Sequence, residues 1–230
     1  MNRTDATFLG AGIYSVSEAA RLTKVPSARV RRWLQDYSFE SQGRHRESKA
    51  VWIPQLPRIG GQLGLGFRDL LEIRFVDAFV RAGVTWPTVR KAAEKAADLL
   101  NATHPFSTFR FKTDGRLIFA DVSGAIGDTS LLELTKSQHY FARIIRPYLR
   151  GIEFCSDEPV RWWPLGNRRC VVLDPQRAFG QPIIASRGVP TAVLAQAMHA
   201  NGSAAQVARW FETDVNSVRD ALDFEEHLAA

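Results

Sequence analysis

The stretch that most constrains the fold of this chain is Tyr14–Leu34, which has the pattern of two short helices joined by a tight turn. Its sequence is YSVSEAARLTKVPSARVRRWL. Ser15 followed three residues later by Glu18 is a capping-box pattern, and it predicts a helix over residues 16–23. The turn follows at residues 24–26. The segment is therefore predicted to be a helix-turn-helix.

The second helix of this pair is predicted to be capped by Ser27. At about 100° per residue, three apolar residues fall on one arc of the helix, namely Val30, Trp33 and Leu34. Burial of that arc turns the neighbouring arginines outward, namely Arg29, Arg31 and Arg32. Arginines on such a face can donate hydrogen bonds to guanine or phosphate when the helix lies in a DNA major groove. The alternative is a solvated basic face on an ordinary helical hairpin.

A short basic segment follows at Gly43–Trp52 and is apolar only at its end, which is typical of a β-hairpin wing that lies along DNA phosphates. The candidate DNA contacts are Ser15, Ser17, Ser27, Arg29, Arg31, Arg32, Arg44, His45, Arg46 and Lys49. The charge distribution agrees, because residues 1–60 hold ten Lys/Arg against five Asp/Glu, and residues 202–230 hold two against six. The first end of the chain therefore suits double-stranded DNA, and the other end does not.

Two further helices are predicted after the wing. A loop rich in glycine and proline leads into a helix over about Phe67–Ala82, whose apolar residues follow the i, i+3, i+4, i+7 spacing and cover a second face as well. Such a helix is buried on more than one side. Gly83 ends it, Thr85 can cap the next helix, and Pro87 lies in the first turn of that helix. The glycine cluster has no phosphate-binding motif and is interpreted as a hinge.

The middle of the chain changes from a helical to a period-two pattern. Apolar and polar residues alternate over residues 109–112 and again over 116–119. Between them lies Asp114-Gly115, a dipeptide that favours a hairpin turn. The pattern predicts a β-hairpin over residues 109–119.

Further strands are predicted in the middle region at Leu131–Leu134, Ile152–Phe154 and Val160–Trp163, around a helix from about Ser137 to Arg146. Together with the hairpin they would form a small α+β domain. We expect this domain to pair two subunits, because DNA-binding proteins of this size usually bind paired half-sites. The alternative is a monomer in which the domain packs only on its neighbours.

The last part of the chain is predicted to contain short strands and then three helices. Pro190 begins the first of these helices, Ser203 caps the second and Asp214 caps the third. The third carries five acidic residues against one arginine, so docking it on phosphate would place like charges together. It is interpreted as a protein-binding element, and the alternative is a solvated acidic tail.

The predicted fold class is α+β and mainly helical, with domains at residues 1–103, 104–169 and 170–230. Hydrophobic residues make up 45% of the chain, as in a globular protein, and neither a membrane-spanning run nor a signal peptide is visible. A cytoplasmic location is therefore expected. Cys155 and Cys170 are interpreted as reduced structural thiols. The histidines are scattered and no catalytic motif occurs, so no enzyme activity, metal site or cofactor is predicted.

The order of the elements over about residues 13–100 resembles the MerR family of winged-helix transcription regulators. The resemblance rests on the helix-turn-helix sequence, on the basic wing and on FRDLLEIRFVDAFVRAGVTWPTVRKA at residues 67–92. It implies a winged helix-turn-helix DNA-binding domain. No long heptad segment follows the fourth helix, so the coiled coil through which MerR regulators dimerise is missing, and the middle domain is expected to pair the subunits instead.

Residues 170–225 resemble a small antitoxin-associated domain catalogued as a family of unknown function. The matching motifs include Leu173-Asp174-Pro175, Phe179-Gly180-Gln181-Pro182-Ile183-Ile184, Val189-Pro190 and Val218-Arg219-Asp220-Ala221-Leu222. The resemblance implies a VapB-type antitoxin that pairs with a PIN-domain ribonuclease toxin, whose active site is an acidic, metal-binding cluster. An inserted arginine could neutralise such a cluster. The candidate arginines are Arg168, Arg169, Arg177 and Arg187.

The leading hypothesis is a DNA-binding antitoxin of a type II toxin-antitoxin system. Such a protein would act as a homodimer, repress its own operon through the winged helix and neutralise the toxin through the last domain. The alternative is a stand-alone MerR-like regulator that responds to a ligand, with an apolar pocket lined by Trp162, Trp163, Phe109 and Phe119.

Overall fold

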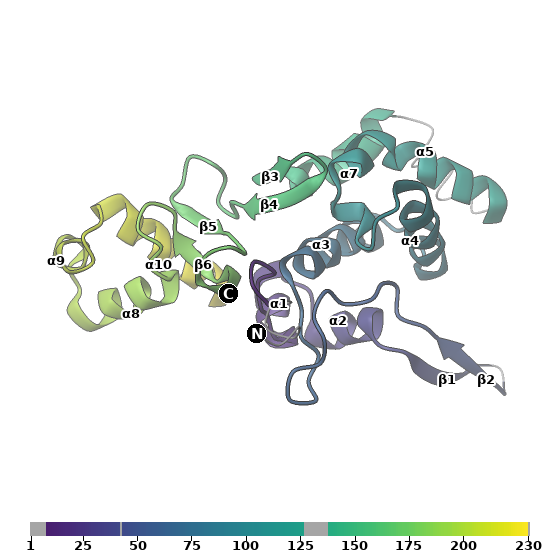
Figure 1. Ribbon diagram of the computed structural model, residues 1–230, viewed down its shortest axis with the longest axis horizontal. Coiled ribbons are helices and arrows are strands. Elements are labelled where there is room, and N and C mark those ends of the chain that lie inside the picture. Colours follow the sequence, from purple (N-terminus) through teal and green to yellow (C-terminus); the bar gives the residue numbers. More distant parts are fainter. Residues whose placement is uncertain (1–7, 42, 127–137, 230) are drawn as a thin grey trace. The chain divides into compact units, whose positions relative to one another are not determined.

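The computed structural model describes residues 8–41, 43–126 and 138–229 (Figure 1). In this part of the chain the protein is α+β and mainly helical, with two small sheets, which confirms the fold class at that level. None of the helices described there is both long enough and apolar enough to cross a membrane.

The chain divides into two compact units, which are described separately. The larger unit comprises Ser15–Leu149 and Ser156–Glu158. The smaller unit comprises the described residues up to Tyr14, the segment Arg150–Cys155 and the chain from Pro159 onward. The smaller unit therefore combines segments from near both ends of the sequence.

The larger unit contains the predicted helix pair, a β-hairpin and a bundle of further helices. Its elements are α1 (Val16–Thr23), α2 (Ser27–Leu34), β1 (Tyr37–Ser41), β2 (Arg44–Ser48), α3 (Phe67–Arg81), α4 (Trp86–Leu100), the 3-10 turn η2 (Pro105–Ser107), α5 (Phe109–Ile126) and α7 (Gln138–Leu149). Strands β1 and β2 pair antiparallel, with Tyr37 opposite Ser48 and Ser41 opposite Arg44. The basic wing segment is therefore the second strand of a hairpin whose first strand starts directly after α2.

Helix α3 is buried around most of its circumference, as its two apolar faces predict. Near its end Phe79 joins a cluster of aromatic rings with Phe106 of η2 and with Phe111 and Phe119 of α5. The ring centroids of Phe79 and Phe119 are 4.5 Å apart. This cluster forms the core between α3, η2 and α5.

The β-hairpin predicted at residues 109–119 is wrong, because this segment is part of the helix α5. Among the α5 side chains that the structure describes, the buried residues recur with the helical period and are Phe111, Gly115, Ile118, Phe119 and Val122. Phe109 and Leu117, which the period-two pattern places on the same face as Phe111 and Phe119, are exposed. A side chain at Gly115 would collide with the ring of Phe111 one turn earlier. The glycine therefore makes room for an aromatic ring and does not form a turn.

Two other predictions for the middle region have different outcomes. The strand predicted at residues 131–134 lies outside the described residues. The helix predicted over residues 137–146 is present as α7, but it continues through Pro147 to Leu149. A proline removes one helical hydrogen bond, and here the helix ends within a turn of it.

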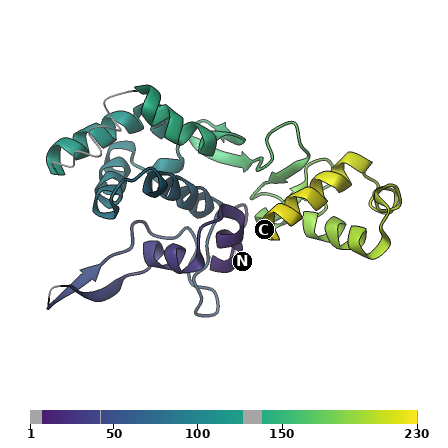
Figure 2. The ribbon, with the colours of Figure 1, turned by 180° about the vertical axis from the view of Figure 1, so that it is seen from behind.

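The smaller unit places a sheet beside three helices. Its elements are β3 (Ile152–Cys155), β4 (Glu158–Trp162, whose first residue belongs to the larger unit), β5 (Val171–Leu173), the 3-10 turn η3 (Ala178–Gly180), β6 (Pro182–Ile184), α8 (Thr191–Asn201), α9 (Ala204–Trp210) and α10 (Val215–Ala229). The strands lie in the order β3-β4-β5-β6, and β5 pairs antiparallel with β6. Helices α8 and α10 pack side by side, as Figures 1 and 2 show from opposite directions.

The helix starts of the smaller unit confirm the predicted caps. The Ser203 hydroxyl accepts a hydrogen bond from the backbone of Gln206. Asp214 Oδ1 accepts one from the Ser217 backbone at 2.9 Å. Pro190 is the residue before α8, which ends at Gly202 in the left-handed region.

The helical period of α5 predicts unequal effects for two neighbouring phenylalanines. Phe111→Ala should lower the free energy of unfolding by about 3–5 kcal/mol, because it empties a fully buried ring site. Phe109→Ala should cost well under half of that, because the Phe109 side chain is 41% exposed. Denaturant unfolding of the two variants measures the difference. Equal losses would support the hairpin, in which both rings share one face.

Candidate nucleic-acid interface

Ser15 and Glu18 cap the start of α1 as the sequence predicts. The Ser15 backbone N–H donates to Glu18 Oε2 at 2.8 Å, and the Glu18 N–H donates to Ser15 Oγ at 3.2 Å. The hydroxyl oxygens of Ser15 and Ser17 lie 2.9 Å apart. The Ser15 hydroxyl is therefore engaged in the cap, while Ser17 is exposed in the first turn of α1.

Helix α2 buries its apolar arc and exposes all three of its arginines, of which Arg29 is paired with a residue of another helix. Val30, Trp33 and Leu34 are buried, as predicted. Arg31 and Arg32 are exposed. The Arg32 guanidinium carbon lies 5.8 Å from the centre of the Tyr37 ring, at the first residue of β1. The exposed arginine face of α2 is thus continuous with the start of the hairpin.

The third arginine of α2, Arg29, is engaged inside the unit. Its Nη1 lies 3.1 Å from Oδ1 of the buried Asp77 on α3, and Arg81 donates to the other carboxylate oxygen. This ion pair fastens α2 to α3. Ser27 is half-buried and is the first residue of α2, with Pro26 at the N-cap position, so the prediction that Ser27 caps this helix is wrong.

The hairpin is fixed at its base by Arg90 of α4. Its Nη2 donates to Ser48 Oγ at 2.8 Å and to the Lys49 carbonyl at 2.5 Å. The Arg90 guanidinium also lies 5.8 Å from the centre of the Trp86 ring. Trp86 in turn stacks on Trp33 of α2 with ring centroids 5.7 Å apart. These contacts connect the hairpin and α2 through α4.

Sequence reasoning did not identify Trp86 or Arg90, and Arg90 lies 41 residues beyond Lys49, the residue at the base of the hairpin that it binds. Of the predicted wing residues, His45 and Lys49 are exposed. Arg44 and Arg46 lie on β2, and their side chains are outside the described set. The structure thus brings α2 and the hairpin together.

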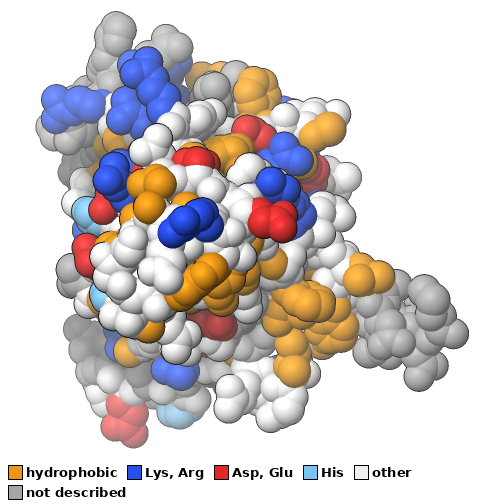
Figure 3. Space-filling view, turned by 90° about the vertical axis from the view of Figure 1, so that its left-hand side faces the viewer, with side chains coloured by type: hydrophobic (Ala, Val, Ile, Leu, Met, Phe, Trp, Pro, Cys, Tyr) orange, Lys and Arg blue, Asp and Glu red, His pale blue; other side chains and the backbone are white. Residues whose placement is uncertain are grey.

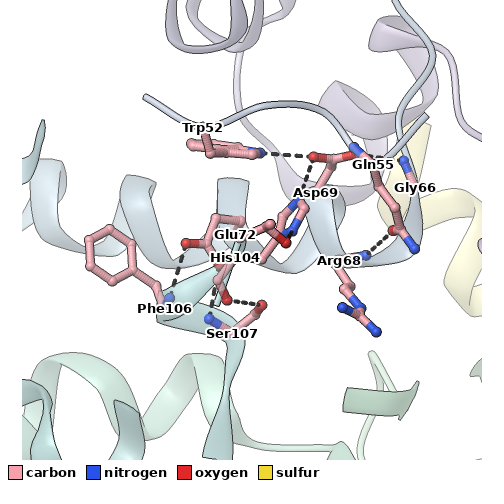
Figure 4. A network of polar contacts seen from close by, with 10 residues as sticks. Trp52, Gln55, Gly66, Arg68, Asp69, Glu72, His104, Phe106 and Ser107 are labelled. Carbon is pink, nitrogen blue, oxygen red and sulfur yellow. Dashed lines mark hydrogen bonds and ion pairs between the residues drawn. The ribbon is translucent and has the colours of Figure 1, made fainter. Parts of the chain in front are cut away.

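Asp69 organises the loop that links the hairpin to α3 (Figure 4). Its fully buried carboxylate accepts hydrogen bonds from the Trp52 indole at 2.8 Å and from the backbone of Gln55 at 2.9 Å and Gly66 at 2.8 Å. His104 Nε2 lies 2.8 Å from the same carboxylate. One side chain therefore holds both ends of the loop and the segment after α4.

Glu72 lies one turn later on α3 and binds η2 in a similar way (Figure 4). Its two carboxylate oxygens accept the backbone N–H groups of Phe106 at 3.0 Å and Ser107 at 2.9 Å. Burial raises the pKa of Glu72 to about 7, although the charge of His104 and the two N–H donors oppose that shift. Glu72 is therefore a buried carboxyl group that titrates near neutral pH.

The four candidate toxin-binding arginines of the smaller unit fall into two classes. Arg169 pairs with Asp220 at 2.5 Å and Asp223 at 2.6 Å on α10. Arg177 donates to the Ala185 carbonyl at 2.7 Å. Arg168 and Arg187 are exposed, and no bond joins either of them to another described residue. Two of the four are thus structural, and two are free to meet a partner.

The acidic residues of α10 are mostly used within the unit. Asp220 accepts the Cys170 backbone N–H at 2.8 Å as well as pairing with Arg169. Glu225 accepts the Thr191 hydroxyl at 2.5 Å, which links α10 to the start of α8. These carboxylates hold neighbouring segments, so the acidic composition of α10 has a structural explanation.

The aromatic residues considered for a ligand pocket are divided between the two units. Phe119 is buried in the ring cluster of the larger unit, and Phe109 begins α5 there. Trp162 is buried in the smaller unit, and the Trp163 indole donates to Glu153 at 2.7 Å. Among the described residues, no group of three or more His, Cys, Asp or Glu side chains is placed to hold a metal ion.

The raised pKa of Glu72 predicts a loss of stability as pH rises. The folded state keeps a proton on Glu72 up to about pH 7, whereas the ordinary value of this carboxyl is 4.5. The free energy of unfolding should therefore fall between about pH 4.5 and 7, by up to about 3 kcal/mol from this group. Denaturant unfolding from pH 5 to 8 measures this slope.

The variant Glu72→Gln cannot titrate and should lose that part of the pH dependence. Glu226→Gln, at an exposed position of α10, is the matched control and should keep the slope of the unchanged protein. Parallel pH profiles for the unchanged protein and Glu72→Gln would contradict the assignment.

Comparisons with known proteins find a relative that matches most of the chain and a solved structure with the same fold. No family model matches the sequence. The chain is 28% identical over 223 residues to a Mycobacterium tuberculosis protein named "Putative antitoxin VapB45", and the match covers 92% of each chain. The crystal structure of Rv2018 from Mycobacterium tuberculosis superposes with a TM-score of 0.72 at 23% identity, covering 94% of this chain and 99% of that one. The fold is therefore shared with a solved structure, and the sequence is similar to that of a protein named as an antitoxin.

Proposed function

We propose that this chain is the antitoxin of a type II toxin-antitoxin system, a non-enzymatic protein that neutralises a toxin and represses its own operon. The observation that carries the proposal is the similarity to a protein named as an antitoxin across 92% of both chains. A match of that extent includes both compact units, so it favours a common role for the whole chain rather than for one shared domain.

We assign DNA binding to the larger unit, as a MerR-like winged helix-turn-helix. The proposal is supported by the exposed Arg31 and Arg32 on α2, whose apolar side is fully buried. Arg90 holds the base of the β1-β2 hairpin in contact with the same unit, as a wing requires. Arg29 belongs to the scaffold in this proposal, because Asp77 binds it. A homodimer would place two such units on paired half-sites.

We assign toxin binding to the smaller unit. The expected toxin is a PIN-domain ribonuclease, as the sequence resemblance of residues 170–225 implies. Arg168 and Arg187 are the candidate contacts that remain available, because Arg169 and Arg177 bind within the unit. Free guanidinium groups suit a partner with an acidic active site.

The DNA-binding proposal predicts the effect of a double substitution on α2. Arg31→Ala together with Arg32→Ala should weaken binding to the duplex upstream of this chain's gene at least about tenfold, and should lower the salt dependence of log K by about 2. Fluorescence anisotropy over a salt series measures both quantities with the full-length protein.

The matched control is Arg209→Ala together with Arg219→Ala, which removes the same charge from exposed positions of the smaller unit. It should change the affinity by less than about threefold. Equal losses in the two double variants would mean that net charge alone governs binding, and would remove α2 from the interface.

The division of roles predicts that DNA binding and toxin neutralisation can be separated. Cells that co-express the neighbouring toxin gene with the Arg31→Ala, Arg32→Ala variant should grow as well as cells with the unchanged antitoxin. Growth is the readout, and an immunoblot confirms equal protein levels. Growth arrest with the variant at equal levels would contradict the assignment of toxin binding to the smaller unit.

A further inference from the structure

The loop of residues 176–180 in the smaller unit, called the Phe179 loop below, has an unusual backbone. Ala178, Phe179 and Gly180 are consecutive and all have positive φ, at 46°, 52° and 80°. A left-handed conformation costs roughly 1–2 kcal/mol for a residue with a side chain, and the residues that adopt it are mostly glycine and asparagine. Two of these three positions therefore hold residues poorly suited to their conformation.

Hydrogen bonds on both sides of the Phe179 loop hold this conformation. The Ile13 N–H donates to the Phe179 carbonyl at 2.9 Å, and the Tyr14 hydroxyl donates to the Gly180 carbonyl at 2.6 Å. The Arg177 N–H donates to the carbonyl of the buried Asp174 at 2.9 Å. All of these bonds use main-chain atoms of the loop, so none of them requires a phenylalanine at position 179.

The side chain of Phe179 is largely outside the core. It is 62% exposed, although phenylalanine is among the residues most strongly stabilised by burial. Leu9 is 71% exposed, and the next residue, Gly10, lies against the side chain of Gln176 in the same loop. The fold thus exposes an aromatic ring to water on a backbone that hydrogen bonds hold in the left-handed region.

The sequence on either side of Phe179 carries more positive than negative charge. Between residues 170 and 190 the sole acidic residue is Asp174, which is buried and bound to Arg161 at 2.9 Å. Arg177 precedes the strained residues, and its guanidinium lies against Gly188, next to the exposed Arg187. An apolar anchor with cationic neighbours fits a protein pocket that is apolar inside and carries carboxylates at its rim.

We propose that Phe179 is the central anchor by which this chain docks on its toxin, with Arg187 as a charged contact at the edge. The inference rests on the proposed function for the identity of the partner. Rigid aromatic side chains dominate the binding energy of many protein interfaces, because they bury a large area at small entropic cost. The hydrogen-bonded loop fixes the backbone that carries the ring before the partner arrives.

Two other occupants fit the same surface less well. A second copy of this chain would bring two cationic loops together in a symmetric contact, which like charges oppose. A nucleic acid could stack a base on Phe179, but it would offer phosphates rather than an apolar pocket for the ring. Both occupants give distinct results in the experiment below.

The test uses the full-length protein and the purified toxin encoded beside it, with binding measured by biolayer interferometry. Phe179→Ala should weaken toxin binding by about 30-fold or more, as loss of a hot-spot aromatic does, and the loss should appear in the dissociation rate. Phe179→Tyr keeps the ring and should restore binding to within about threefold. Trp210→Ala is the control, because Trp210 is a second exposed aromatic residue, 54% exposed at the end of α9. It should leave toxin affinity unchanged. Figure 3 shows one face of the molecule, on which hydrophobic side chains lie between scattered charges.

Thermal unfolding of Phe179→Ala should match the unchanged protein, since the exposed ring contributes little to the core. If the unchanged protein binds the toxin and Phe179→Ala binds it equally well, the anchor is wrong while the proposed function stands. If the unchanged protein does not bind the toxin, both fall. Loss of DNA affinity or of self-association in Phe179→Ala, with toxin binding kept, would instead assign the loop to one of the other occupants.

Discussion

The carboxylate of Asp69 is the interaction on which the larger unit most depends. Four donors from separate segments converge on its two oxygens, which can accept about four hydrogen bonds in all. A buried carboxylate that loses its partners costs several kcal/mol. The segments that carry the four donors are therefore stable in this arrangement only together. The linker between the hairpin and α3 has almost no regular structure, and this single side chain fixes where it begins and ends. One turn further along α3, the Glu72 side chain holds η2 in the same way, by accepting two of its backbone N–H groups.

The features that could be read from the sequence were those that depend on neighbouring residues. The capping box at Ser15 and the caps at Ser203 and Asp214 are local patterns, and the structure contains all three. The α5 segment was misread because Phe111 and Phe119 fit both a period of two and a helical turn. Only the packing of Phe79 against both rings decides between the two, and that partner lies more than thirty residues away.

The partners of the arginines also could not be predicted from the sequence, because they lie far away along the chain. The sequence placed Arg29 with Arg31 and Arg32, but its carboxylate partner lies 48 residues later on another helix. Arg169 finds Asp223 at a separation of 54 residues. Composition counts all of these cations equally, whereas the structure separates those already paired from those still available. The acidic residues of α3 are a signal that the sequence analysis did not use, because carboxylates inside a helix that is apolar on two faces must find partners within the protein.

The bond between Tyr14 and Gly180 joins residues 166 positions apart in the sequence. During synthesis Ser15–Leu149, which is most of the larger unit, leaves the ribosome before the Phe179 loop and can fold early. The residues up to Tyr14 can form their hydrogen bonds to the loop only after the loop has been synthesised. The smaller unit is therefore completed late, because its first segment is synthesised long before the loop to which it bonds. A nascent or truncated chain that ends before this loop would retain the arginine face of α2 but would lack β6 and the bond from Tyr14 to Gly180, so the proposed DNA binding would become available before the proposed toxin binding.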